Sequence, residues 1–282
     1  MLTRAGQAIA KTVVVWRTTG SPASRLRRGQ YRTLLSKISC PPLDSAVPER
    51  PCTMVVAESL LYPSSSSWNS AFKSRAPQDH GISTGAFSWS DSVTNWKAAL
   101  DELKADLSAH HDVVFIARGP LQCWIAQLYL ESHPLAGLIL VDPLPLDDRN
   151  GINQFELYYE KHSFKQSKEY HIFRSILDDT TMSAPIPHAL QLEAGAVPMM
   201  VWHSIPRPAF KRAADSTAQR HSNSNGPFGI VPVLQLHLPL VKSTPNVLGI
   251  NSLENAKGGL EMDKYAREAV DIACSWTIDQ VL

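Results

Sequence analysis

Cysteine is scarce in this chain, and charged residues are also few. Four cysteines among 282 residues exclude the class of small secreted proteins that are built on disulfides. No apolar run approaches the roughly 20 residues that a membrane-spanning helix needs, so we expect no membrane span. Charged residues make up only 19% of the chain and hydrophobic residues 44%. This balance excludes wholesale disorder and allows a sizeable core.

The first 43 residues contain no acidic residue. They hold eight basic residues, which leaves 19 basic and 26 acidic residues in 44–282. The net charge of +1 is therefore the sum of a +8 opening segment and a −7 body. Within the opening segment Leu2, Ala5 and Ile9 are spaced three to four residues apart, which predicts an apolar stripe on a basic helix.

A basic, acid-free, amphipathic N-terminus is typical of a mitochondrial transit peptide. We therefore predict a mitochondrial protein, in the matrix, with residues 1–43 either cleaved or retained. The alternatives are an ordinary solvated arm and a retained arm that contacts RNA phosphates by neutralising their charge. The residues expected to contact RNA or a protein partner from a retained arm are Arg25, Arg27, Arg28 and Arg32.

The body alternates between strand-like and helix-like stretches. Short apolar runs predict strands at 52–57, 112–117, 137–142, 197–202, 231–236 and 246–250. Apolar periodicity predicts helices at 92–107, 124–132, 209–219 and 262–278, the first of them capped by Ser92. Residues 73–91 are polar and predict mostly loop. A helical cap or insertion is expected at about 152–192.

The order of elements over 112–142 is strand, turn, helix, strand. This order over about 30 residues predicts a right-handed parallel βαβ crossover. Both strands are continuously apolar, as expected where helices cover both faces of a sheet. The sequence therefore predicts one α/β domain over 44–282, with a mostly parallel sheet, helices on both faces and a small helical cap.

Three consecutive segments resemble the α/β-hydrolase family. They are Asp112-Val-Val-Phe-Ile-Ala-Arg-Gly-Pro-Leu121, Ala126-Gln-Leu-Tyr-Leu-Glu-Ser-His-Pro134 and Gly137-Leu-Ile-Leu-Val-Asp-Pro143. They are similar to the strand before the family's nucleophile elbow, the helix after it and the following strand. The resemblance covers roughly Cys52 to the C-terminus. It implies a G-x-S-x-G turn that presents a nucleophilic serine.

At the expected elbow the chain reads Ala117-Arg118-Gly119-Pro120-Leu121. Gly119 falls at the nucleophile position and has no side chain with which to attack. The family's oxyanion hole uses the backbone N–H of the residue after the nucleophile, but Pro120 has no N–H. Because the nucleophile and one oxyanion donor are both missing, we expect no acyl transfer at this turn.

The other positions that the resemblance implies are also occupied by unsuitable residues. The family's first strand commonly ends in His-Gly, whereas Glu58 stands there in this chain, and a carboxylate would repel a developing oxyanion. Arg207 stands at the approximate position of the family's acid. Ala256 stands where the family's histidine is expected. The sequence therefore predicts no catalytic residues at these three family positions, Gly119, Arg207 and Ala256.

His203, His237 and Cys123 are the remaining residues that could form a triad. We interpret each as a core or surface residue, because a nucleophile needs a base within hydrogen-bond reach and an aimed oxyanion hole. No spacing of cysteine and histidine is typical of a metal site, and no glycine-rich loop predicts a phosphate site. We therefore expect neither a metal nor a cofactor.

The resemblance to a hydrolase and the loss of its reactive residues predict a catalytically inactive protein whose scaffold is reused. Our main hypothesis is a structural or binding subunit of a mitochondrial assembly, with other protein subunits as partners. The mitochondrial ribosome comes first, because a basic tail can neutralise RNA phosphates, and a respiratory or ATP synthase complex comes second. The alternatives are a divergent serine or cysteine ester hydrolase and a small-ligand-binding module whose cap covers an apolar pocket.

Overall fold

The fold is known from a computed structural model of the chain. It describes residues 38–41, 46–59, 62, 65–145, 149–161, 167–179, 194–205, 207–236 and 252–282, without side chains at 65–67, 149, 158–161 and 252–263. Contacts divide the chain into two units, Met1–Arg32 and Thr33–Leu282, and the described residues all belong to the second. Of the predicted arm, 1–43, only 38–41 are described, and Arg25, Arg27, Arg28 and Arg32 lie outside the described residues.

One parallel sheet organises the described chain. Its strands are β1 (Thr53–Glu58), β2 (Ser83–Phe87), β3 (Val113–Arg118), β4 (Gly137–Val141), β5 (Met199–His203) and β6 (Val233–Gln235). They lie in the order β2-β1-β3-β4-β5-β6, and every neighbouring pair is parallel. An isolated antiparallel bridge joins Ser39 to Thr84. The predicted mostly parallel sheet is confirmed, and the strand predicted at 246–250 lies outside the described residues.

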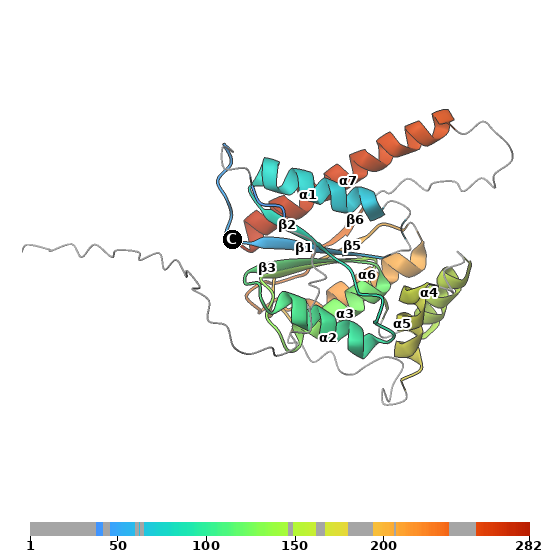
Figure 1. Cartoon of the computed structure of the whole chain (residues 1–282). Helices are drawn as coiled ribbons and strands as arrows, with labels where there is room; N and C mark the ends of the chain where they lie inside the picture. The colour runs from blue at the N-terminus through green and yellow to red at the C-terminus, as the bar shows by residue number, and fades with distance from the viewer. Residues whose placement is uncertain are drawn as a thin grey trace, which may run out of the picture. The chain divides into compact units, whose positions relative to one another are not determined.

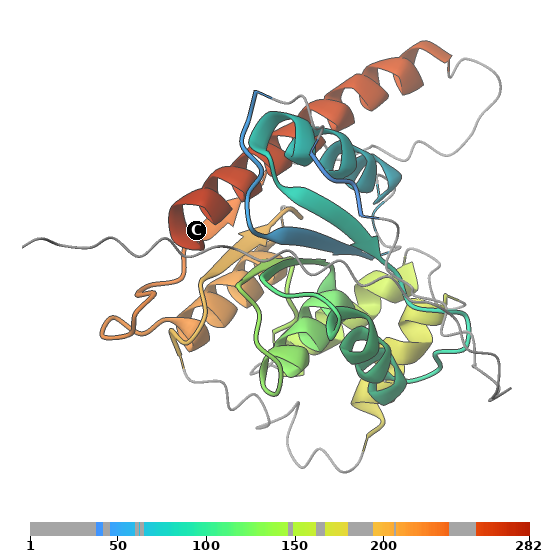
Figure 2. The ribbon, with the colours of Figure 1, turned by 60° about the vertical axis from the view of Figure 1, so that its left-hand side comes forward.

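Helices cover both faces of this sheet, as Figures 1 and 2 show. They are α1 (Ser65–His80), α2 (Trp96–Leu107), α3 (Pro120–Leu130), α4 (Arg149–Lys161), α5 (Lys168–Leu177), α6 (Pro208–His221) and α7 (Ser252–Gln280). Helices α1 and α7 pack on one face over Met54, Val114 and Trp202. Helices α2, α3 and α6 pack on the other, over Val55 and Phe115. Because successive strand side chains point to opposite faces, each strand contributes to both cores.

Residues 73–91 differ from the predicted loop. Helix α1 continues to His80 with Pro77 inside it, and β2 follows at 83–87. Strand β2 reads Ser-Thr-Gly-Ala-Phe, and its first three residues are buried because it pairs with β1 and is covered by α1. The polar composition of this stretch hid a strand whose burial depends on neighbours that are distant in sequence.

The boundaries of three helices also differ from prediction. Helix α2 is capped by Asn95, whose side chain accepts a hydrogen bond from the N–H of Ala98 at 3.0 Å, rather than by Ser92. Helix α3 begins directly at Pro120, because proline at the first helical position has the required φ and needs no N–H partner. Helix α7 starts at Ser252, so Ala256 lies inside it, in the part whose side chains are not described.

The predicted cap corresponds to α4 and α5, and 180–193 lies outside the described residues. Helices α4 and α5 join the same core as α2, α3 and α6, through Ile152, Phe155, Tyr170, Ile172 and Phe173.

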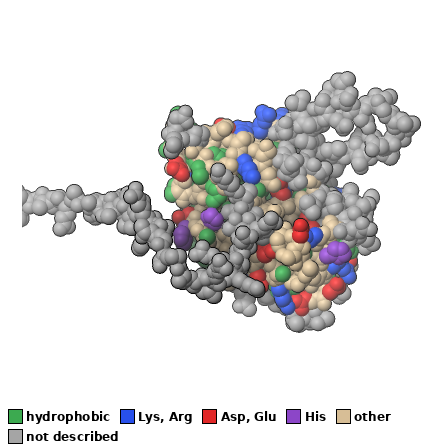
Figure 3. Space-filling view, in the orientation of Figure 1, with side chains coloured by type: hydrophobic (Ala, Val, Ile, Leu, Met, Phe, Trp, Pro, Cys, Tyr) green, Lys and Arg blue, Asp and Glu red, His purple; other side chains and the backbone are tan. Residues whose placement is uncertain are grey.

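On the face seen in Figure 3, acidic and basic side chains are interspersed. Among the described residues, no helix combines the length and the apolar character that crossing a membrane requires.

Candidate functional site

The candidate site lies at the carboxyl ends of β1 and β3. From β1 the chain moves to β2 on one side, and from β3 it moves to β4 on the other, so the strand order reverses between these neighbours. In open α/β sheets, the crevice at such a switch point is where ligands bind. The parallel register places Glu58, the last residue of β1, beside Arg118, the last residue of β3.

Glu58 and Arg118 form a buried ion pair at this point. Arg118 Nη1 donates to Glu58 Oε1 at 2.7 Å, and the two side chains are 0% and 3% exposed. The guanidinium also lies 4.2 Å from the ring centre of Tyr62 and 4.0 Å from that of Trp68, which adds a cation–π attraction. Both side chains therefore bind groups of the protein itself at the place where a ligand would be expected.

The pKa of the Glu58 carboxyl is raised to about 7. Burial is the main cause, because it penalises the charged carboxylate. The charge and hydrogen bond of Arg118, together with the backbone N–H of Asn69, act in the opposite direction. From the sequence, Glu58 was expected only to oppose an oxyanion, and its pairing with Arg118 was not predicted. The position of both residues at the ends of consecutive predicted strands was the available signal.

Gly119, which the resemblance places at the family's nucleophile position, has a backbone that excludes a side chain. Its φ is +122° and its ψ is 158°, a combination that is essentially restricted to glycine. A Cβ atom on this residue would lie 2.4 Å from Cβ of Ser59 and 2.6 Å from Oε1 of Gln122. The path from β3 through Gly119 to α3 is strand, turn and helix, and the space that a side chain on residue 119 would need is filled.

Ser59, directly after β1, fills much of that space. Its Oγ atom lies 3.1 Å from where the Cβ atom of residue 119 would be. The Ser59 hydroxyl donates a hydrogen bond to Oε1 of Glu169, which comes from α5 in the cap. Both residues are buried, at 0% and 5% exposure. This pair was not predicted from the sequence, because 110 residues separate its members and no motif connects them.

Asp142 connects the ends of the next two strands. It follows β4 with a positive φ of 56° and accepts hydrogen bonds from the hydroxyl of Tyr62 at 2.6 Å and from the N–H of Ser204 at 2.7 Å. It also accepts one from the Ser204 hydroxyl. Burial, followed by the charge of Asp142, raises the pKa of Tyr62 well above its usual value. Asp142 is therefore a structural acceptor that links Tyr62 to the residue after β5.

Cys123 and His203, which were interpreted as core or surface residues, are both buried. The thiol of Cys123 donates to the carbonyl oxygens of Ala117 at 3.1 Å and Val141 at 3.3 Å. Burial raises its pKa well above the usual value, so the reactive thiolate is suppressed. His203 is the last residue of β5 and is 5% exposed, whereas His237 lies outside the described residues.

The residues at the positions implied for the family's acid and histidine, Arg207 and Ala256, do not form a triad with the residues described above. Arg207 is exposed and is the N-cap residue of α6, and Ala256 lies within α7. Among the described residues, no group of three or more histidine, cysteine, aspartate or glutamate side chains is arranged to hold a metal ion. The side chains at the carboxyl ends of the strands bind one another through an ion pair and hydrogen bonds. The arrangement there that could support a reaction is the Ser59 hydroxyl beside the carboxyl group of Glu169.

No protein-family model matches this sequence, and no curated protein does either. A crystal structure of a single-substitution variant of the esterase rPPE matches with a TM-score of 0.52 at 12% identity, over 86% of this chain and 77% of that one. An alpha-beta serine hydrolase homologue from Coxiella burnetii matches with a TM-score of 0.43 at 12% identity, over 82% and 89%. A hormone-sensitive lipase from a metagenome library gives 0.48 at 12% identity, over 84% and 81%. The chain has an α/β-hydrolase-like fold.

Proposed function

We propose that this protein is a catalytically inactive member of the α/β-hydrolase fold that serves as a structural or binding subunit of a mitochondrial assembly. The observation that carries the proposal is the filled nucleophile position at Gly119, where Ser59 and Gln122 occupy the space of a side chain. An elbow that can hold no nucleophile cannot form the acyl-enzyme on which hydrolases of this kind depend.

The surroundings of the elbow support the same proposal. Pro120 removes one oxyanion donor, because proline has no N–H. Glu58 and Arg118 neutralise each other within the switch point. These buried contacts connect β1, β3 and α1 and favour a stable scaffold over an open cleft. A small-ligand-binding module is correspondingly disfavoured, because side chains of the protein occupy the switch point where the ligand would bind.

The mitochondrial part of the proposal rests on the opening segment. Residues 1–43 carry +8 and no acidic residue, as transit peptides do. A ribosome is the first candidate assembly, because a basic segment retained on the mature protein can neutralise ribosomal RNA phosphates. A respiratory or ATP synthase complex is the second candidate.

Native size separation of mitochondrial extract, with identification of the proteins that migrate with this one, tests the assembly. We expect the protein in a fraction far larger than its own 31.1 kDa, together with fixed partners. Recovery only as a monomer contradicts the proposal. Sequencing of the mature N-terminus decides independently whether residues 1–43 are removed.

A divergent serine hydrolase is the second candidate function, and the Ser59–Glu169 hydrogen bond favours it. In that mechanism Glu169 accepts the hydroxyl proton while Ser59 Oγ attacks an ester carbonyl. The alcohol then leaves with the returned proton, and water releases the acid. Pro120 and the burial of both residues oppose it.

A fluorophosphonate probe distinguishes the two candidates. The inactive scaffold predicts no labelling, whereas the hydrolase predicts one labelled side chain at Ser59. That labelling should be lost in Ser59→Ala and kept in the control Ser175→Ala. Ser175 is a matched control because it lies on α5, as Glu169 does, and its hydroxyl accepts a hydrogen bond from the N–H of Trp96.

A further inference from the structure

Residues 38–41 belong to the acid-free opening segment, yet they are bound to the sheet. Ser39 forms an antiparallel bridge with Thr84 of β2. The N–H of Ser39 donates to the carbonyl oxygen of Thr84 at 2.8 Å, and the N–H of Thr84 donates to the carbonyl oxygen of Ser39 at 2.9 Å. Two residues that exchange both bonds form the hydrogen-bonded pair of an antiparallel ladder. Ser39 therefore extends the sheet beyond β2 by one residue.

This bridge covers the outer edge of β2. Strand β2 comes first in the order β2-β1-β3-β4-β5-β6, so β1 pairs with it on one side only. The N–H and carbonyl groups of Thr84 bond to Ser39 on the other side, and Thr84 is only 1% exposed. An uncovered edge presents backbone groups with which another chain can pair. Ser39 thus binds two backbone groups of a buried residue and protects this edge of the sheet.

A second attachment lies just before β2. The N–H of Arg50 donates to the carbonyl oxygen of Gly81 at 2.8 Å. Gly81 has a φ of +70°, and a Cβ atom on it would lie 2.2 Å from the carbonyl oxygen of Pro48. Glycine accommodates both this backbone conformation and this close approach. The described residues that precede β1 are therefore bound to β2 at Ser39 and to the residue after α1 at Arg50.

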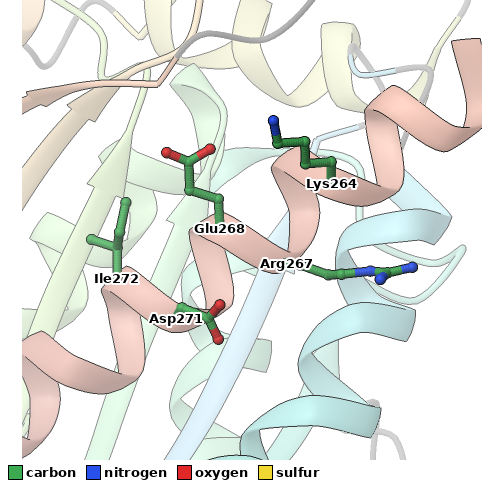
Figure 4. Close-up of a pocket in the computed structure, with 5 residues that line it drawn as sticks. All are labelled: Lys264, Arg267, Glu268, Asp271 and Ile272. Atoms are coloured by element: carbon green, nitrogen blue, oxygen red, sulfur yellow. The ribbon is translucent and has the colours of Figure 1, made fainter.

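The end of α1 that leads to Gly81 is held against α7. Oδ1 of Asp271 lies 3.0 Å from Nη2 of Arg75 and 3.1 Å from Nε2 of His80, the last residue of α1. Figure 4 shows Asp271 among the side chains that line a hollow of about 620 Å³ on α7. Because His80 directly precedes Gly81, Arg50 binds to a part of the fold that is itself fixed by contacts between two helices.

The charge of the opening segment ends where these contacts begin. Its eight basic residues all lie at or before Lys37, whereas the first described residue is Ile38. Residues 38–43 contain no charged residue. Contacts divide the chain between Arg32 and Thr33. The residues whose composition is typical of a transit peptide and the residues that are bound to the sheet therefore do not overlap.

We propose that the opening segment is removed by cleavage of one peptide bond between Arg32 and Ile38, so that the mature chain begins at a residue from 33 to 38. Hydrolysis adds one water molecule across that bond, which leaves a carboxylate on the removed segment and an amino group on the body. This cleavage rests on the proposed mitochondrial location. It places the end of the removable segment before Ser39 rather than at residue 43.

Removal of all residues up to 43 would take away the edge partner of β2. Without Ser39, the N–H and carbonyl groups of Thr84 lose both of their bonds, and the edge of β2 is open to pairing with other chains. Cleavage before Ile38 avoids this loss and still removes the four arginines of the arm. The mature body then carries −7, or −6 where Lys37 is retained. Its contacts within an assembly would therefore be made by the body and not by a basic arm.

N-terminal sequencing of the mature protein from purified mitochondria tests the cleavage position. We expect a first residue within 33–38. A first residue before Thr33, Met1 included, would leave arginines of the arm on the body. A first residue after Ile38 would show that the segment bound to β2 is not kept intact. Either result overturns the proposal.

Limited proteolysis of the purified full chain tests the protection that the bridge provides. A broad-specificity protease should leave a folded fragment whose first residue also lies within 33–38. Ser39→Pro removes the N–H that donates to Thr84, so the first residue of the fragment should shift to beyond Pro41. The matched control is Cys40→Ser at the neighbouring exposed residue, which should cause no shift. The absence of a shift in Ser39→Pro, or an equal shift in both variants, overturns the proposal.

The cleavage position and the subunit role can fail separately. If the mature chain begins outside 33–38 but the protein still migrates within a large mitochondrial assembly, the cleavage position is wrong and the subunit role stands. If the mature chain begins within 33–38 but is recovered only as a monomer, the subunit role is wrong and the cleavage position stands.

Discussion

The Cβ atom of Ser59 lies 2.4 Å from the position that a Cβ atom on Gly119 would take. Ser59 and Gly119 directly follow the adjacent strands β1 and β3. The side chain of Ser59 fills the space that a side chain at position 119 would need. Real Cβ contacts essentially never occur at this distance, so a side chain cannot be placed at position 119 by a single substitution unless Ser59 shifts.

Gly119→Ser should yield no esterase activity and should destabilise the protein. The positive φ costs about 1–3 kcal/mol for a residue other than glycine, and overpacking adds roughly 1–3 kcal/mol. Denaturant unfolding measures the loss. The double variant Ser59→Gly/Gly119→Ser should regain part of the overpacking cost and stay destabilised, because the backbone strain and the contact with Gln122 persist and the hydroxyl that donates to Glu169 is lost. Full recovery in the double variant would show that the clash alone matters.

Removal of Arg118 should be costly in a manner that depends on pH. Arg118→Met leaves Glu58 buried without its cation, and breaking a buried pair in this way costs about 3–5 kcal/mol. The loss should be large at pH 8, where Glu58 is charged, and smaller at pH 5, where it can hold a proton. The control Glu58→Leu/Arg118→Met removes both charges and should lose less at pH 8. Equal losses at both pH values would contradict a role for the charge of Glu58.

The stability of the protein should depend on pH through two groups of opposite effect. Burial raises the pKa of Glu58 from 4.5 to about 7, so between these values only the folded state holds the proton and stability falls as pH rises. Burial, with the charge of Arg220, lowers the pKa of His221 from 6.5 to about 4. Between those values only the unfolded state holds the proton, so stability rises with pH.

Single substitutions should separate these two slopes. Each group changes the free energy of unfolding by roughly 3 kcal/mol between its two pKa values. The two changes oppose each other between pH 4.5 and 6.5. In Glu58→Gln, stability should rise with pH up to about 6.5. In His221→Gln, it should fall with pH up to about 7. Urea unfolding across pH 4–8 gives both profiles, and a variant slope of the wrong sign would refute the corresponding assignment.

The N-cap residue of helix α2 can be identified by two matched substitutions. Asn95 accepts the N–H of Ala98 at 3.0 Å, so Asn95→Ala should cost about 1 kcal/mol of stability. Ser92 bonds to Ser90 instead, with their oxygens 2.6 Å apart, so Ser92→Ala should cost little. Thermal unfolding of the two variants distinguishes them, and a larger loss in Ser92→Ala would return the cap to that residue.

The hydrogen bond from Ser59, directly after β1, to Glu169 of α5 should control the local stability of α5. Ser59→Ala removes the hydroxyl that donates to Glu169, and a buried carboxylate that loses a donor costs about 1–3 kcal/mol. Hydrogen exchange should accelerate in α5 and not in α7. The control Lys211→Ala, at an exposed pair on α6, should leave both helices unchanged.

Local sequence determined the layered fold and the residue types at the turn after β3. The apolar runs at 112–117 and 137–142 are the buried strands β3 and β4, because a strand covered on both faces must be apolar throughout. The identity of Gly119 and Pro120 fixed the missing side chain and the missing N–H, since both are covalent properties of single residues. The N-terminal charge asymmetry is likewise a property of the sequence.

Only the tertiary structure decided which distant residues share the switch point. The pairing of β1 with β3 brings Glu58 to Arg118 across 60 residues, and the cap brings Glu169 to Ser59 across 110. Strand β2 was hidden for the same reason, because its burial comes from β1 and α1 rather than from its own composition. Hydrogen bonds and ion pairs between remote residues depend on strand order and helix packing, and these carry no local periodicity.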